Sequence, residues 1–84
     1  MSYTITHARG GIPSHIDGNV YPRRSDLIAS VAPAFGLDVN AAAFVHVAEI
    51  EGGNIIGEWY VYRSNEDAWN DSDGTAALFV IGRV

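Results

Sequence analysis

The sequence predicts an α+β domain in which one helix packs on one face of a mostly antiparallel sheet of four or five strands. Three observations lead to this class: an alternating run opens the chain, an apolar stripe at helical spacing follows, and the later apolar runs are rich in strand-forming residues. The expected order of elements is β-α-β-β-β. With 84 residues, the whole chain (1–84) is expected to form a single domain.

The strongest local signal is a hairpin between Ala42 and Arg63. Two apolar runs flank Gly52 and Gly53, and a glycine pair suits a two-residue turn because both central positions need positive φ. Such a turn sets the directly opposite pairs, which are Glu51 with Asn54, Ile50 with Ile55, Ala48 with Gly57, His46 with Trp59 and Phe44 with Val61. The face that these last four pairs share is the more apolar one and is expected to face the core.

A helix over Val39–Ile50 is the rival interpretation of the first half of this hairpin, since Ala41–Ala43 favour a helix. The β-branched Val45 and Val47 and the glycine pair that follows favour the strand.

The N-terminal part supplies a first strand and a turn-rich segment. Ser2–Ala8 alternates, with one side formed by Tyr3, Ile5 and His7 and the other by Thr4, Thr6 and Ala8. The residues of Arg9–Asn19 include three glycines, a proline and an aspartate, which are typical of turns. Two interpretations remain open for this segment: a surface loop, or a short additional strand at Ile12–Ile16.

The predicted helix begins at Ser25, which suits the N-cap, and Asp26 suits the positive end of the helix dipole. An apolar stripe follows at i, i+4 and i+8, formed by Leu27, Val31 and Phe35. This stripe is expected to lie across the core face of the sheet.

Pro33 is expected to kink this helix or to end it near Ala32, because proline lacks an N–H and clashes with the preceding turn. Gly36 is placed as the residue that follows the helix, and Leu37 is expected to close the cap by an apolar contact.

Composition narrows the functional classes. Ten carboxylates oppose five arginines, there is no lysine, and the net charge is −5. Nucleic-acid binding needs a basic surface, so a direct nucleic-acid partner is not expected. The acidity favours a basic protein partner, or it serves solubility alone. The sequence shows neither a membrane-spanning apolar run nor a secretory signal, so a cytoplasmic protein with no membrane partner is expected.

The residues that bind metals do not form a recognised pattern. There is no cysteine, and the histidines His7, His15 and His46 lack the local spacing of known sites, even with Asp17 as a fourth ligand. The segment 71–74 (DSDG) resembles the middle of a calcium loop, but Trp69 and Val80 stand where that loop needs acidic ligands. No metal and no cofactor are therefore expected.

Catalytic and phosphate-binding motifs are also missing. Arg9-Gly10-Gly11 follows a strand and Arg23-Arg24 precede a helix, yet neither belongs to a glycine-rich phosphate loop. There is no Gly-x-Ser-x-Gly sequence, and a domain of this size has little material for a deep pocket. No catalytic residue is therefore assigned, and a non-enzymatic protein is expected.

Two groups of residues are candidates for binding a protein partner. The first is the predicted loop Ser64–Gly74, where carboxylates surround one tryptophan: Trp69 with Glu66, Asp67, Asp71 and Asp73. In the alternative interpretation Trp69 folds back onto the sheet edge. The second group is Tyr60 and Tyr62, an aromatic stripe on the less apolar sheet face. That stripe is exposed unless Arg9–Asn19 covers it.

A small acidic chain without cysteine, with a strand, a helix that begins SDLIAS and then three strands, resembles the small phage-encoded inhibitors of bacterial defence, such as type I anti-CRISPR proteins. The resemblance implies a protein that acts in the host cytoplasm without catalysis. It also implies binding to the basic, nucleic-acid-binding surface of a host complex, such as a CRISPR effector complex.

Two alternatives remain beside this interpretation. The first is a small homo-oligomeric accessory protein, such as a homodimer, that pairs through open edge strands or through Tyr60 and Tyr62. The second is a small enzyme or ligand-binding domain that uses His46, Trp59 and an N-terminal arginine.

Overall fold

The computed structural model describes residues 2–38, 43–51, 54–71 and 75–84. It confirms the α+β class and the antiparallel sheet. The elements follow in the order β1 (Tyr3–Ala8), α1 (Arg24–Val31), the 3₁₀ helix η1 (Ala32–Phe35), β2 (Ala43–Glu51), β3 (Asn54–Tyr62), α2 (Asn65–Asn70) and β4 (Phe79–Arg83).

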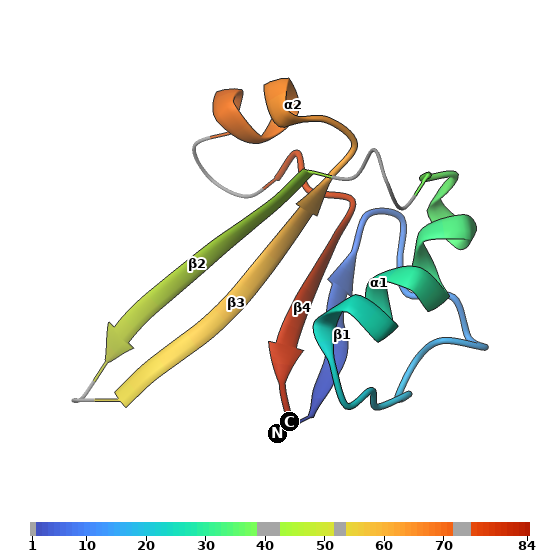
Figure 1. Ribbon diagram of the computed structural model, residues 1–84, viewed down its shortest axis with the longest axis horizontal. Helices are drawn as coiled ribbons and strands as arrows, with labels where there is room; N and C mark the ends of the chain where they lie inside the picture. Colours follow the sequence, from blue (N-terminus) through green and yellow to red (C-terminus); the bar gives the residue numbers. More distant parts are fainter. Residues whose placement is uncertain (1, 39–42, 52–53, 72–74) are drawn as a thin grey trace.

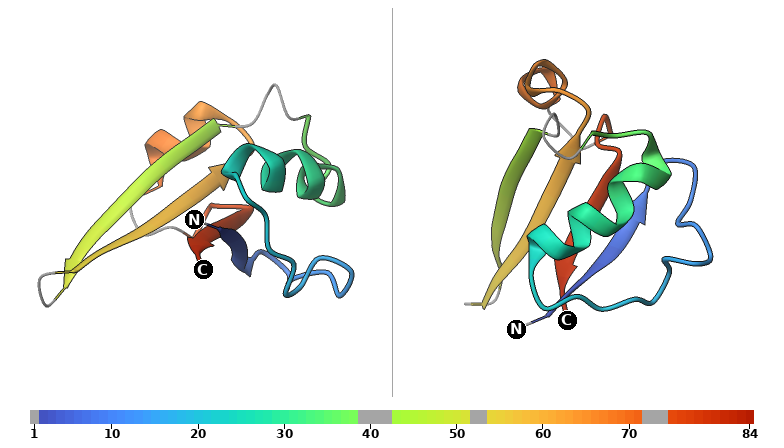
Figure 2. Two further views of the ribbon diagram at one scale, coloured as in Figure 1. Left: turned by 60° about the horizontal axis from the view of Figure 1, so that its bottom comes forward. Right: turned by 45° about the vertical axis from the view of Figure 1, so that its right-hand side comes forward.

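Within the described part of the chain, the strand order across the sheet is β1-β4-β3-β2. Figure 1 shows β1 and β4 side by side, with both chain termini at the same end of the sheet. Figures 1 and 2 show α1 lying across one face, over β1 and β4, while α2 sits at the end where β2 begins and β3 ends. The two helical segments therefore lie at different places on the sheet.

The predicted hairpin register is confirmed over its full length. Glu51 pairs with Asn54, and the pairing continues without a shift to Ala43 and Tyr62. On the predicted core face of β3, Trp59 is 3% exposed and Val61 is fully buried. The turn residues Gly52 and Gly53 lie outside the described part of the chain.

The alternation predicted for Ser2–Ala8 is wrong beyond Ile5. Ile5 pairs with Ile81 and His7 pairs with Val80, so Thr6 is an extra residue in β1, which is a β-bulge. The bulge reverses the faces after it. Ile5 and Ala8 are therefore both buried, while His7 is exposed together with Thr6.

Helix α1 begins earlier than predicted. Its N-cap is Arg23, and no side chain caps the first turn, so Ser25 lies inside the helix. The stripe is confirmed at Leu27 and Val31, which are fully buried, and Phe35 stacks on Phe79 with ring centroids 5.0 Å apart.

The end of the helix follows the sequence prediction. The α-helix stops at Val31, and Pro33 lies in the first turn of the 3₁₀ segment Ala32–Phe35. Gly36 follows with φ 70°, and the Leu37 N–H donates to the Ala32 carbonyl at 3.0 Å. Leu37 is buried in the main hydrophobic cluster.

The segment 9–20 is a loop, and Ile12–Ile16 forms no strand. Ile16 is buried in the same cluster as Leu27, Val61 and Phe79, so this loop closes the core on the face that carries α1. Tyr21 then returns to β1, where its N–H and C=O each bond to Tyr3 at 2.8 Å.

Candidate protein-interaction surface

The acidic segment after β3 is a short helix, which corrects the predicted loop. The hydroxyl of Ser64 accepts a hydrogen bond from the Asp67 N–H at 3.2 Å and so caps α2. Glu66 and Asp67 stand in the first turn, where the helix dipole favours negative charge. A serine followed three residues later by aspartate is a helix-start signal in the sequence that could have revealed this helix.

Helix α2 contacts the sheet through Ala68. Ala68 packs against a second buried cluster formed by Tyr62 and Ala77, to which Tyr60 and Ala76 also contribute. Just after the helix, Asp71 accepts a hydrogen bond from the Tyr62 hydroxyl through Oδ2 at 2.7 Å. These contacts determine which side of α2 faces the sheet.

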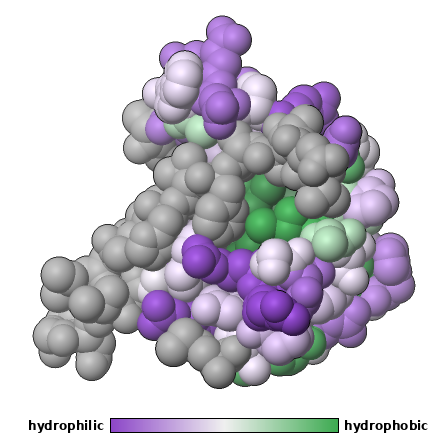
Figure 3. All heavy atoms as spheres, viewed as in Figure 1, coloured by the Kyte–Doolittle hydropathy of each residue, from purple (hydrophilic) through white to green (hydrophobic). Residues whose placement is uncertain are grey.

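Trp69 follows Ala68 on α2 and is turned away from these contacts, with an exposed fraction of 81%. The alternative in which Trp69 folds back onto the sheet is therefore wrong. The side chains of Glu66 and Asp67 are exposed as well. Figure 3 shows hydrophilic side chains projecting at the top of the molecule, where Figure 1 places α2. The structure thus brings one large exposed aromatic ring and two carboxylates together on one small helix.

Two other predicted partner residues do not share this exposure. Tyr62 is 4% exposed, so the exposure expected for it is wrong. Tyr62 is covered by α2 and by the segment around Ala77, whereas the alternative predicted from the sequence has the loop 9–19 as the cover. Asp71 is half-buried and bonded to Tyr62, so it holds α2 in place. Asp73 lies outside the described residues.

Tyr60 remains accessible in part. It is half-buried, and its hydroxyl donates to Glu58 Oε2 at 2.9 Å. It lies on the sheet face opposite Trp59, in register with Val80 of β4.

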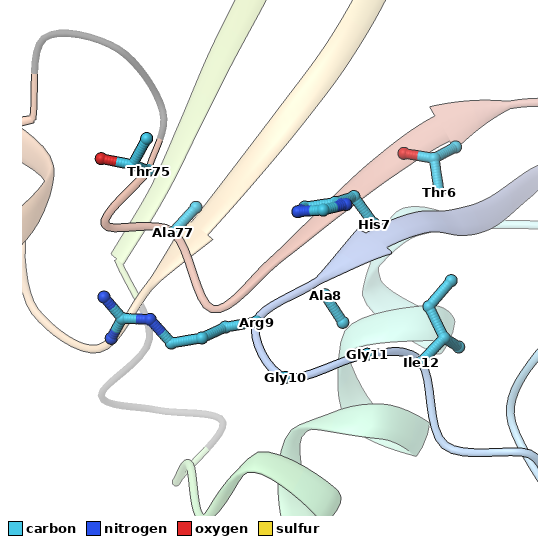
Figure 4. A pocket seen from close by; sticks show the side chains of 9 residues that line it. All are labelled: Thr6, His7, Ala8, Arg9, Gly10, Gly11, Ile12, Thr75 and Ala77. Carbon is cyan, nitrogen blue, oxygen red and sulfur yellow. The ribbon is translucent and has the colours of Figure 1, made fainter.

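A groove of about 470 Å³ lies where β1 runs into the following loop. Figure 4 shows His7 and Arg9 extending toward the segment that carries Thr75 and Ala77. The groove is lined by Thr6, His7, Ala8, Arg9, Gly10, Gly11, Ile12, Thr75 and Ala77, which include no carboxylate. It is the part of the described surface where the Arg9-Gly10-Gly11 sequence comes together with a histidine.

Trp59, a candidate in the ligand-binding alternative, is enclosed by its neighbours. The Cζ atom of Arg24 lies 4.7 Å from its ring centroid and that of Arg83 lies 5.4 Å away. Tyr3 meets the ring edge to face at 5.5 Å. Cations on an indole face are attracted by its quadrupole, so this cluster stabilises the fold. Arg23 instead pairs with Asp26 at 3.4 Å on the surface.

No group of three potential metal ligands occurs among the described residues. In the same part of the chain, none of the helices has the length and apolarity needed to cross a bilayer. Comparison with protein-family models, with curated proteins and with solved structures finds no match for this chain.

Proposed function

We propose that this chain is a non-enzymatic protein-interaction domain that binds a basic partner through α2, with Trp69 as the anchor. The observation that supports this most is the 81% exposure of Trp69. Tryptophan is costly to leave in water and is enriched among the residues that dominate binding energies at interfaces. The scaffold is the small α+β domain, for which the sequence predicts four or five strands in a β-α-β-β-β order.

Glu66 and Asp67 supply the second part of the proposal. Both are exposed on the helix that carries Trp69, and the chain as a whole has a net charge of −5. Carboxylates around an apolar anchor speed the encounter with a positively charged surface and fix its orientation. Tyr60 is a candidate for further contact with the partner, because it lies at the end of β3 that is next to α2. Tyr62 and Asp71 instead hold α2 on the sheet.

For the partner, we propose a basic, nucleic-acid-binding surface of a host complex in the cytoplasm, in the manner of phage-encoded inhibitors such as anti-CRISPR proteins. An acidic protein that occupies such a surface excludes the nucleic acid by competition, because both ligands need the same cations. No catalytic step is involved.

The experiment is affinity capture from nuclease-treated host lysate with the tagged chain. The Trp69→Ala variant is expected to lose the captured protein while it keeps the parent's circular dichroism spectrum. Val20→Ala is the matched control, because Val20 is also an exposed apolar residue, at 54% exposure, but lies far along the chain from α2. Added nucleic acid is expected to displace the captured protein. Equal capture by the parent and by Trp69→Ala would contradict the proposal.

A further inference from the structure

The two edges of the sheet differ in how they are protected. At the β1 edge, Tyr21 bonds to both backbone groups of Tyr3, and the bulge at Thr6 interrupts the regular ladder. Covered backbone groups and bulges are two of the means by which proteins keep an edge strand from pairing with another chain. The β1 edge is therefore protected within the described structure.

Within the described structure, neither protection occurs along most of the β2 edge. β2 runs for nine residues, Ala43–Glu51, in continuous register with β3 and without a bulge. Its sequence, AFVHVAEIE, contains no proline and no lysine, and its charged residues stand only toward the turn. In Figures 1 and 2, α2 lies near the beginning of β2, and no other described segment lies beside the outer edge of this strand. A long, regular edge whose charged residues lie only near the turn is a template for a further strand.

Hydrogen bonds elsewhere in the sheet determine which backbone groups of β2 face outward. The Val61 carbonyl accepts from the Leu78 N–H at 2.8 Å, so the backbone groups of Val61 point toward β4. Those of its neighbours Tyr60 and Tyr62 then point toward β2, since backbone groups alternate along a strand. Their partners Val45 and Ala43 point back toward β3. The groups left facing outward belong to the even-numbered residues Phe44, His46, Ala48 and Ile50.

The half of the hairpin nearest the turn also has no described strand beside β3 on the side of β4. β4 pairs with β3 only over Glu58–Val61. Among the described residues, Asn54–Gly57 therefore have β2 as their sole strand neighbour. A two-stranded ribbon is marginally stable in water by itself. In this ribbon Ile50 pairs with Ile55, and Glu49 pairs with Ile56. A further strand beside it would therefore add to its stability.

We propose that a second copy of this chain supplies this cover, with β2 pairing antiparallel to the partner's β2 about a two-fold axis at Val47. In this register all nine residues of each strand overlap, and the even-numbered residues form the hydrogen-bonded pairs, as their outward backbone groups require. Glu49 then stands opposite the partner's Val45, and Glu51 opposite the partner's Ala43. A shift that centres the axis on Glu49 places two like charges directly opposite each other, which is destabilising.

The first test is sedimentation equilibrium of the purified chain and of Ala48→Pro. The parent is expected to sediment at about twice the 9.0 kDa of one chain. Ala48→Pro removes an outward N–H and leaves the hydrogen bonds to β3 intact, so it is expected to be a folded monomer. Val47→Lys is the second variant: within one chain the lysine faces Glu58, but in the dimer two lysines meet at the axis.

The second test reports the register. The sequence contains no cysteine, so single cysteines can be introduced without side reactions. Val47→Cys is expected to form a disulfide-linked dimer under mild oxidation, because opposite residues at a non-hydrogen-bonded position have Cα atoms about 4.5 Å apart. Val45→Cys is the matched control, since its two copies are displaced by four positions, about 13 Å along the strand.

The outcomes are decisive in both directions. A monomer at the highest soluble concentration overturns the proposal. A dimer that persists in both Ala48→Pro and Val47→Lys places the contact elsewhere and also overturns it. Faster crosslinking of Val45→Cys than of Val47→Cys rejects the register. The result does not depend on Trp69, so it is independent of the partner proposed for α2.

Discussion

The indole of Trp59 lies over the backbone of Gly57 so closely that a Cβ atom there would stand 2.9 Å from its Cη2 atom. Gly57 and Trp59 are two residues apart on β3, so they share a face of the sheet. The glycine is therefore required by the ring, and Trp59 reaches its 3% exposure because that position has no side chain.

Gly57→Ala is expected to destabilise the domain by about 1–3 kcal/mol, the range for an added group in a packed core. Urea unfolding followed by circular dichroism measures the change. In a Trp59→Phe background the smaller ring leaves room, and the same alanine is expected to cost less. An equal loss of stability in both backgrounds would show that the indole ring is not the reason why position 57 requires glycine.

A second close pair links the bulge in β1 to β4. A Cβ atom at Gly82 would stand 2.7 Å from the Cγ2 methyl of Thr6. Gly82→Ala is therefore expected to lower stability by about 1–3 kcal/mol, and Thr6→Ser, which removes that methyl, is expected to recover part of the loss. Thermal melts of the four proteins of this double-mutant cycle check the coupling. Purely additive effects would argue against the contact.

The hydrogen bond from Tyr62 to Asp71 is expected to hold α2 on the sheet. Tyr62→Phe removes the hydroxyl from a buried site and is expected to cost about 1.5–3 kcal/mol, the range for bonds to charged groups. Tyr60→Phe is the control: its hydroxyl bonds to Glu58, but the residue is half-buried, so a smaller loss is expected. Chemical denaturation of both variants decides, and a larger loss for Tyr60→Phe would contradict this role for Tyr62.

The hairpin was predictable because two kinds of information agree there. The glycine pair fixes the turn length, and the apolar pattern fixes which face is buried, so the pairs from Glu51–Asn54 to Phe44–Val61 follow. The end of α1 was predictable for a similar reason, since Pro33 and Gly36 act through local backbone geometry.

The bulge at Thr6 was not predictable from alternation, because one inserted residue changes the faces only after the partner strand is known. The burial of Tyr62 depends in the same way on α2, which the prediction of a loop over Ser64–Gly74 leaves out. The exposure of Trp69 follows from Ala68 facing the sheet, and a single-sequence pattern over six residues does not determine that contact.

The proposed function rests most directly on Trp69 as a binding anchor. Trp69→Ala is expected to leave the unfolding free energy within about 0.5 kcal/mol of the parent, as for other exposed positions. The dissociation constant for the purified captured partner, measured by isothermal titration calorimetry, is expected to rise by roughly 30-fold or more, corresponding to about 2 kcal/mol for an anchor residue. A folded Trp69→Ala variant with the parent's dissociation constant would contradict the proposed function.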